Sequence, residues 1–162
     1  METLTPTLGS TDIAAAPALA TATAAAPAPA SSPDYAVVLL PLEMLHASEH
    51  VDATAVMQLA REIEAAGIWT TPLPIEAATG MVMDGNHRLS VASRLGLRCL
   101  PCVLLSYDDP CVRVTRWLDG MPFERHELKH MAVSCTLLPY KSTRHRFDPL
   151  LPRVAIALAT LR

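Results

Sequence analysis

The first 33 residues restrict what this 162-residue chain can fold into, because they offer almost nothing from which a hydrophobic core could be built. They are rich in Ala, Pro, Thr and Ser, and residues 11–30 alone contain eleven alanines. Such a segment buries too little apolar surface to offset the entropy that is lost when it becomes ordered. The sequence therefore predicts a disordered tail over residues 1–33 and one folded domain over residues 34–162, which has room for a single compact core.

Several classes of protein are disfavoured by composition. No stretch approaches the roughly 18 consecutive apolar residues that a membrane helix needs. The first basic residue is Arg61, so the N-terminus lacks the positive segment of a secretory signal and the arginines of a transit peptide. We therefore expect a cytoplasmic protein without membrane contact, whose four cysteines are reduced thiols rather than a disulfide framework.

Charge is distributed unevenly along the chain. Residues 1–112 carry a formal charge of −8, whereas residues 113–162 carry +5. A basic C-terminal third on an acidic protein is consistent with an anionic partner such as a nucleotide or nucleic acid. The alternative is that these arginines decorate solvated helices.

Periodicity and turn residues indicate a small α+β domain. Asp52 can cap a helix whose apolar residues recur at helical spacing as far as Ala66, and Gly67 can end it. Short apolar runs rich in β-branched residues favour buried strands. The expected order is strand 36–40, helix 52–66, strands 73–76 and 81–83, helix 86–95, strand 100–106, and helical pieces near 111–118, 123–132 and 150–161. This order is typical of a mixed sheet flanked by helices.

The most informative segment is residues 83–96, where an apolar strand ends in Asp84-Gly85 and a helix begins with Asn-His-Arg. Gly85 allows a sharp turn and the close approach of a ligand, and the free N–H groups of the helix start can bind a phosphate. Arg88 and His87 can add donors, while Asp84 could hold Mg²⁺ or orient a hydroxyl. The alternative is an ordinary strand-to-helix turn with a polar cap. If phosphate binds here, Gly85→Val should block nucleotide binding and leave the fold largely intact.

The run Asp-Gly-Asn-His-Arg at 84–88, the helix after it, and the strand at 100–103 resemble the ParB/sulfiredoxin fold. Members of that fold carry a D-G-H-H-R-type signature before a helix. Asn86 stands where the commoner residue is His and where sulfiredoxins have their reactive Cys, which argues against sulfinic acid reduction. The chain also lacks the second Arg and the helix-turn-helix domain of partitioning ParB proteins.

Two further motifs resemble the free-serine kinase branch of this fold. Residues 138–145, Leu-Pro-Tyr-Lys-Ser-Thr-Arg-His, are similar to its L-P-x-K-[ST]-T-x-H segment. Residues 45–50, Leu-His-Ala-Ser-Glu-His, match a His followed closely by the catalytic Glu. The resemblance covers about residues 36–147. It implies transfer of a phosphoryl group from ADP or ATP, with Mg²⁺, to the hydroxyl of free L-serine, and a product that feeds cysteine or siderophore precursors.

The resemblance also implies roles for individual residues. Glu49 would be the general base that accepts the serine proton, and Asp84 would be the second catalytic residue and the candidate Mg²⁺ ligand. The expected nucleotide and phosphate ligands are Gly85, Asn86, His87, Arg88, Lys141, Ser142, Thr143 and His145. Glu43 is the alternative base, with His46 and His50 close by, and threonine or homoserine are alternative acceptors.

Other candidate sites receive structural interpretations. Cys99 and Cys102 have the spacing of a metal or redox pair, but on a strand they point to opposite faces. His126 and His130 are one helical turn apart and lack a third ligand motif. For the two tryptophans, Trp69 and Trp117, packing is favoured over stacking on a base.

The alternative function is a non-catalytic, ParB-like regulator that binds a nucleotide or DNA through the same residues. The acidic first two-thirds of the chain and the missing helix-turn-helix argue against DNA, because neutralisation of phosphates by Lys and Arg dominates DNA affinity. The basic C-terminal third is the feature that favours this alternative.

Overall fold

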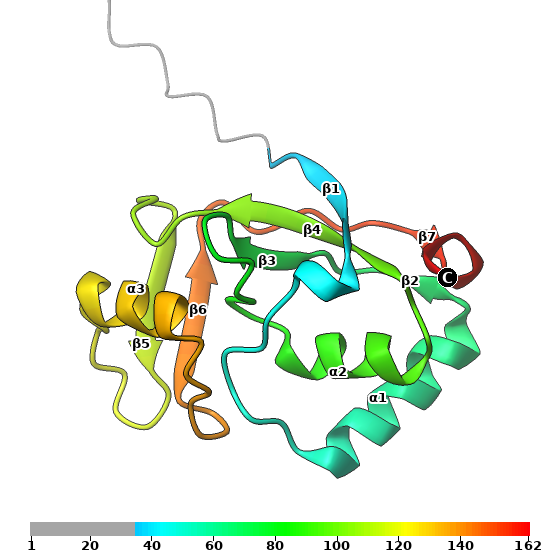
Figure 1. The fold of residues 1–162 in the computed structure, drawn as a ribbon, viewed down its shortest axis with the longest axis horizontal. Coiled ribbons are helices and arrows are strands. Elements are labelled where there is room, and N and C mark those ends of the chain that lie inside the picture. Colours follow the sequence, from blue (N-terminus) through cyan, green and yellow to red (C-terminus); the bar gives the residue numbers. More distant parts are fainter. Residues whose placement is uncertain (1–34) are drawn as a thin grey trace, which may run out of the picture. The chain divides into compact units, whose positions relative to one another are not determined.

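The computed structural model describes residues 35–162, so the tail predicted for residues 1–33 lies outside the described part of the chain. Figure 1 shows the arrangement of the elements. In chain order they are β1 (Val37–Pro41), the 3₁₀ turn η1 (Leu42–Met44), α1 (Ala53–Ala66), β2 (Ile68–Trp69), β3 (Leu73–Glu76), α2 (Asn86–Arg94), β4 (Cys99–Leu105), β5 (Val112–Arg116), α3 (Arg125–Ser134), β6 (Thr143–Phe147), β7 (Ile156–Ala157) and the 3₁₀ turn η2 (Leu158–Leu161). No helix among the described residues is long and apolar enough to cross a membrane.

A three-stranded sheet in the order β1–β4–β3 organises the domain. The central strand β4 runs antiparallel to β1 and parallel to β3, which confirms the predicted mixed sheet. Alternate residues of β4 enter two different apolar clusters, with Leu100 and Cys102 in one and Val103 and Leu105 in the other. Since successive side chains of a strand point to opposite faces, both faces of the sheet are covered.

The first core lies on the face covered by α1 and α2 (Figure 1). Helix α1 begins where Asp52 Oδ1 accepts a hydrogen bond from the Ala55 N–H at 2.7 Å, and it ends at Gly67, whose φ is 67°. Helix α2 begins directly after Gly85 and ends just before Leu95-Gly96. The boundaries of both helices therefore agree to within one residue with those predicted from the capping residues. The buried members of this first core are Leu45, Val56, Ala60, Trp69, Leu73, Ile75, Val82, Leu89, Val91, Ala92, Leu97, Leu100, Cys102, Leu158 and Leu161.

The second core lies between the other face of the sheet, the two-stranded ribbon of β5 and β6, and α3. The ribbon corrects the prediction of a helix at 111–118 and adds a strand at 143–147 that the sequence did not predict. In β5, Val112 and Val114 are buried while Arg113 is exposed, so the period is two rather than 3.6. The buried members of the second core are Met81, Met83, Val103, Leu105, Tyr107, Val112, Val114, Leu128 and Ala132.

Three other sequence predictions need correction. The segment 150–161 forms β7 and η2 rather than an α-helix, because its residues pair with β2 and close the end of the first core. In the segment 81–83, Met81 and Val82 form isolated bridges rather than a strand, and Met83 forms no bridge. The predicted buried strand is β1, but it pairs only with β4, and as an edge strand it leaves Leu39 49% exposed.

Candidate functional site

Glu49 lies in the segment 46–50, which hydrogen bonds connect to two different parts of the domain. It is neither helix nor strand, yet hydrogen bonds fix it on both sides. His46 donates its N–H to Gly80 O at 2.9 Å and accepts from the Val82 N–H at 2.8 Å. On the other side, His50 N–H donates to Leu138 O at 2.9 Å. Glu49 is thereby held beside the loop that leads into β6.

Asn86, the first residue of α2, holds the same segment through its side-chain amide. Its Oδ1 accepts from the Ser48 N–H at 2.8 Å and lies 3.4 Å from Glu49 N, and its Nδ2 donates to Ser48 Oγ at 3.0 Å. The side chain is only 8% exposed. Both ends of the amide are therefore occupied within the protein, and the phosphate-binding role predicted for Asn86 rests on its main-chain N–H.

The carboxylate of Glu49 is oriented by Thr143 at the start of β6. Glu49 Oε1 accepts one hydrogen bond from the Thr143 N–H at 2.7 Å and another from the Thr143 hydroxyl. Within residues 35–162, no group donates to Oε2. One oxygen of Glu49 is thus anchored, and the other is available to accept a proton.

The start of α2 presents unpaired donors to the same space. Gly85 precedes the helix with φ 97°, a backbone conformation that other residues rarely adopt. The first-turn N–H groups have no acceptor within the helix and carry its positive dipole end. His87 Nε2 accepts from the Asp52 N–H at 3.3 Å, which makes that nitrogen unprotonated and leaves Nδ1 as the donor. Asp84 is exposed at the edge of this turn, and Arg88 lies in the first turn of the helix.

Gly85 is also packed tightly against the first core. A Cβ built at this position would lie 2.6 Å from Leu73 Cδ2 and 3.0 Å from an Arg88 guanidinium nitrogen. Because Leu73 is completely buried, it has no free space into which it could move. The expectation that Gly85→Val leaves the fold intact is therefore wrong.

The strand β6 separates the residues of the Lys-Ser-Thr-Arg-His motif. Lys141 has φ 58°, and its Nζ lies 5.1 Å from the centre of the Tyr140 ring and 5.5 Å from that of Trp117. Ser142 donates its hydroxyl to Pro139 O at 2.7 Å, so this hydroxyl closes a turn. Thr143 reaches Glu49 as described above.

His145, the last residue of this motif, does not lie beside Glu49. Its Nε2 lies 3.4 Å from the Tyr107 hydroxyl, and its ring stacks on Phe147 at 10°. Burial lowers the pKa of His145 to about 3, so the imidazole is neutral at physiological pH. Burial also raises the pKa of Tyr107, with smaller contributions from the Glu76 and Glu49 carboxylates.

These groups line a cavity of about 270 Å³. Its lining residues are Glu49, His50, Leu59, Asp84, Gly85, Asn86, His87, Arg88, Trp117, Tyr140, Lys141 and Thr143. The structure thus brings together all the predicted site residues except Ser142 and His145. Trp69 packs in the first core as predicted, whereas Trp117 is 43% exposed at the cavity wall, contrary to the packing role expected for it. The sequence signal for this exposed position is that Trp117 directly follows the alternating residues 112–116.

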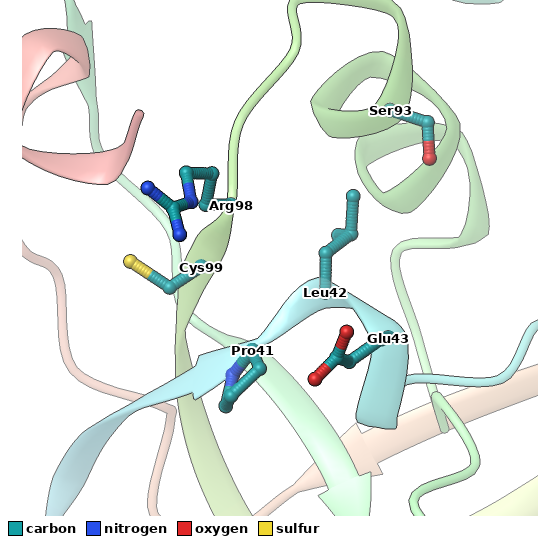
Figure 2. A pocket seen from close by; sticks show the side chains of 6 residues that line it. All are labelled: Pro41, Leu42, Glu43, Ser93, Arg98 and Cys99. Carbon is teal, nitrogen blue, oxygen red and sulfur yellow. The ribbon is translucent and has the colours of Figure 1, made fainter.

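The alternative base, Glu43, does not line the cavity that contains Glu49. It lines a cavity of about 760 Å³ with Pro41, Leu42, Ser93, Arg98 and Cys99, and no residue of 84–88 takes part. Figure 2 shows its carboxylate beside Leu42, across the cavity from Arg98. Glu43 is therefore remote from the predicted phosphate-binding turn.

The other metal and redox candidates remain dispersed. Cys99 and Cys102 lie on β4 as free thiols, and burial raises the pKa of Cys102 to about 12. His126 and His130 lie on α3. Among residues 35–162, no three His, Cys, Asp or Glu side chains gather into a group that could hold a metal ion.

No protein-family model matches this chain. A curated relative, the ATP-dependent L-serine kinase of Desulfurococcus mucosus, is 25% identical over 88 residues, which are 52% of this chain and 34% of that protein. The chain therefore spans about a third of the length of that relative.

Three solved structures share the fold. They are a conserved hypothetical protein from Pyrococcus furiosus (TM-score 0.71), free serine kinase in complex with AMP (0.62), and C-terminally truncated SbnI from Staphylococcus aureus (0.63). Each is 13% identical, and the likeness covers 78% of this chain and 97%, 93% and 89% of those chains, respectively. The fold of these three structures is therefore the fold of this protein, and the predicted α+β class with a small mixed sheet flanked by helices is confirmed.

Proposed function

We propose that this protein is a small-molecule kinase that transfers a phosphoryl group from ADP or ATP to the hydroxyl of free L-serine and forms O-phospho-L-serine. The observation that carries the proposal is the position of Glu49, whose anchored carboxylate faces the start of α2 in one cavity. The names of the serine kinases among the similar proteins support the same assignment.

The chemistry follows from these positions. Phosphoryl transfer requires alignment and neutralisation of charge more than covalent participation by the protein. The first-turn N–H groups of α2, together with Arg88 and Lys141, would hold the phosphate oxygens. Glu49 Oε2 would take the proton of the serine hydroxyl as that oxygen attacks phosphorus, a general-base contribution worth about 10²–10⁴ in rate.

Asp84 fits a role as the protein ligand of Mg²⁺. It is exposed and carries a hard carboxylate oxygen donor at the edge of the same cavity. Mg²⁺ keeps several waters and is usually held by one or two carboxylates and the substrate phosphates, so a single aspartate suits it. When bound, the ion would offset negative charge on the donor phosphates.

The test is an incubation of the full chain with L-serine, Mg²⁺ and either ADP or ATP, followed by mass spectrometry for phosphoserine. Parallel reactions with L-threonine and L-homoserine define the acceptor. Glu49→Gln retains the acceptor for Thr143 but loses basicity, so we expect turnover to fall at least about 100-fold with little change in nucleotide affinity. Glu43→Gln is the matched control and should retain wild-type turnover.

Full activity of Glu49→Gln would assign the proton to another group, and a loss of nucleotide affinity would make Glu49 a binding residue. If the wild type forms no phosphorylated amino acid with either nucleotide, the kinase proposal fails. Binding of nucleotide without turnover would then favour the regulator described above.

A further inference from the structure

A second cavity, of about 770 Å³, lies on the other side of the Asp84–Arg88 turn. It shares only Asp84 and Arg88 with the candidate active site. Its other walls come from β5, β6, the segment that follows β6, and Thr71 in the link between β2 and β3. Apart from Asp84 and Arg88, no residue that lines this cavity has a role in the function proposed above.

Four arginines dominate the charge of this cavity. Arg88 comes from α2, Arg113 from β5, Arg146 from β6, and Arg153 from the C-terminal segment. Within residues 35–162, none of the four has a carboxylate oxygen within 4.0 Å. The cavity also contains Asp84 and Asp148, while His145 is neutral, so its formal charge is +2.

Two of these arginines are placed where they repel each other. Arg113 and Arg146 are directly paired in the antiparallel register of β5 and β6. Like charges directly opposite each other destabilise a strand pair. An anion bound between the two guanidinium groups would remove this repulsion and accept a bidentate hydrogen bond from each.

An apolar wall completes the cavity. Phe147, Leu151 and Pro152 contribute to it, and Leu150 is 86% exposed beside them. A ligand with both a multiply charged group and a carbon framework would use both parts of the surface.

We propose that this cavity is a second anion-binding site, which takes a small organic molecule through a diphosphate group held by Arg113 and Arg146, with Arg88 and Arg153 at its edges. The proposal does not depend on the kinase activity, although Arg88 contributes to both cavities and would couple their occupancy.

Inorganic pyrophosphate is the probe, titrated calorimetrically into the full chain at low salt. We expect Arg113→Gln/Arg146→Gln to weaken binding at this cavity by at least about tenfold, because two charge-assisted contacts are lost. The pair Arg61→Gln/Arg94→Gln removes the same charge on the other side of α1 and α2, and it should leave binding unchanged. Lys141→Gln tests the active-site cavity separately.

If the proposed kinase site also binds pyrophosphate, the wild type binds two molecules and each variant loses a different one. If only the second cavity binds it, Lys141→Gln binds like the wild type, and the proposal stands although the kinase site has failed. Unchanged binding in Arg113→Gln/Arg146→Gln overturns the proposal. So does binding of a single-stranded oligonucleotide without binding of pyrophosphate, because a nucleic acid would then be the ligand.

A measurement without ligand separates loss of fold from loss of site. Since Arg113→Gln/Arg146→Gln removes a repulsive pair, its melting temperature should be no lower than that of the wild type. A variant that melts normally and fails to bind supports the proposal. A variant that melts early is replaced by Arg153→Gln, which lies outside the ribbon and should also weaken pyrophosphate binding; unchanged binding in Arg153→Gln then overturns the proposal.

Discussion

The first core holds its part of the site through buried contacts, whereas the second core presents its part from the exposed end of a ribbon. Asn86, in the first turn of α2, is 8% exposed, and its side-chain amide makes four polar contacts with Ser48 and Glu49. Lys141 and Trp117 are exposed and take part in cation–π contacts, in which Lys141 lies over the Tyr140 and Trp117 rings and Arg144 lies over the Trp117 ring. A buried polar network is costly to disturb, while an exposed cation–π contact contributes only about 0.5–1 kcal/mol.

The two parts of the candidate site therefore differ in rigidity. The turn at Gly85 and the N-terminus of α2 form a rigid cradle, because both are packed on the first core. The side chains at the ribbon end are exposed and restrained by weaker contacts, so they can change conformation more easily. Glu49 joins the two parts, since its segment bonds to Gly80 and Val82 on one side and to Leu138 and Thr143 on the other.

The strongest test of the rigid cradle is Gly85→Ala. The positive φ and the overlap with Leu73 should together lower the free energy of unfolding by about 3 kcal/mol, measured by urea denaturation. Gly96→Ala is the matched control, because Gly96 has φ 66° but nothing within 4 Å of its Cβ position. Its loss should be about 1 kcal/mol. Equal losses for the two variants would mean that packing on Leu73 does not hold the turn.

The next test removes the buried contact between α2 and the segment 46–50. Asn86→Ala leaves the buried Ser48 N–H without its acceptor and should cost about 2 kcal/mol of unfolding free energy. Turnover should fall as well, because Glu49 loses a support. Ser90→Ala, on the same helix, should change the unfolding free energy by less than about 0.5 kcal/mol. A stable Asn86→Ala protein would contradict the assignment of rigidity to this network.

The second core is tested by pH. His145 has a pKa near 3 when folded and 6.5 when free, so below pH 6.5 the unfolded chain binds a proton that the folded chain does not. Stability should therefore fall by up to about 1.4 kcal/mol per pH unit as the pH decreases from 6.5. Between pH 6.5 and 5 we expect a loss of about 1–2 kcal/mol. His145→Gln should flatten this slope, whatever its effect on absolute stability; an unchanged slope would show that His145 is not buried as a neutral group.

The smallest effect is expected outside both cores. Deletion of residues 1–33 should change the free energy of unfolding by less than about 0.5 kcal/mol and leave activity near the wild-type level. Thermal unfolding and the phosphoserine assay check this expectation. A clear fall in melting temperature would mean that this segment packs against the domain and would add a third region to the comparison.

The sequence predicted the first core better than the second for a local reason. Asp52 and Gly67 bound α1, and Gly85 and Gly96 bound α2, through conformational preferences that each residue carries in any context. The apolar run at 100–106 predicted a strand, which is β4. In contrast, β6 contains Thr, Arg, His and Arg, a set that is just as typical of a polar turn, and only pairing with β5 makes it a strand.

The sequence by itself determined which residue types are available at the candidate site: a carboxylate at 49, a glycine-containing strand-to-helix turn at 84–88 and basic residues after 140. Tertiary structure alone decided what each of them contacts. Thr143 meets Glu49 across 94 positions of sequence, and Asn86 meets Ser48 across 38. The alternation of β6 turns Thr143 toward Glu49 and places His145, two residues further on, half-buried beside Tyr107. Such contacts depend on strand register and sheet coverage, which arise from the packing of whole elements, so no local pattern in the chain encodes them.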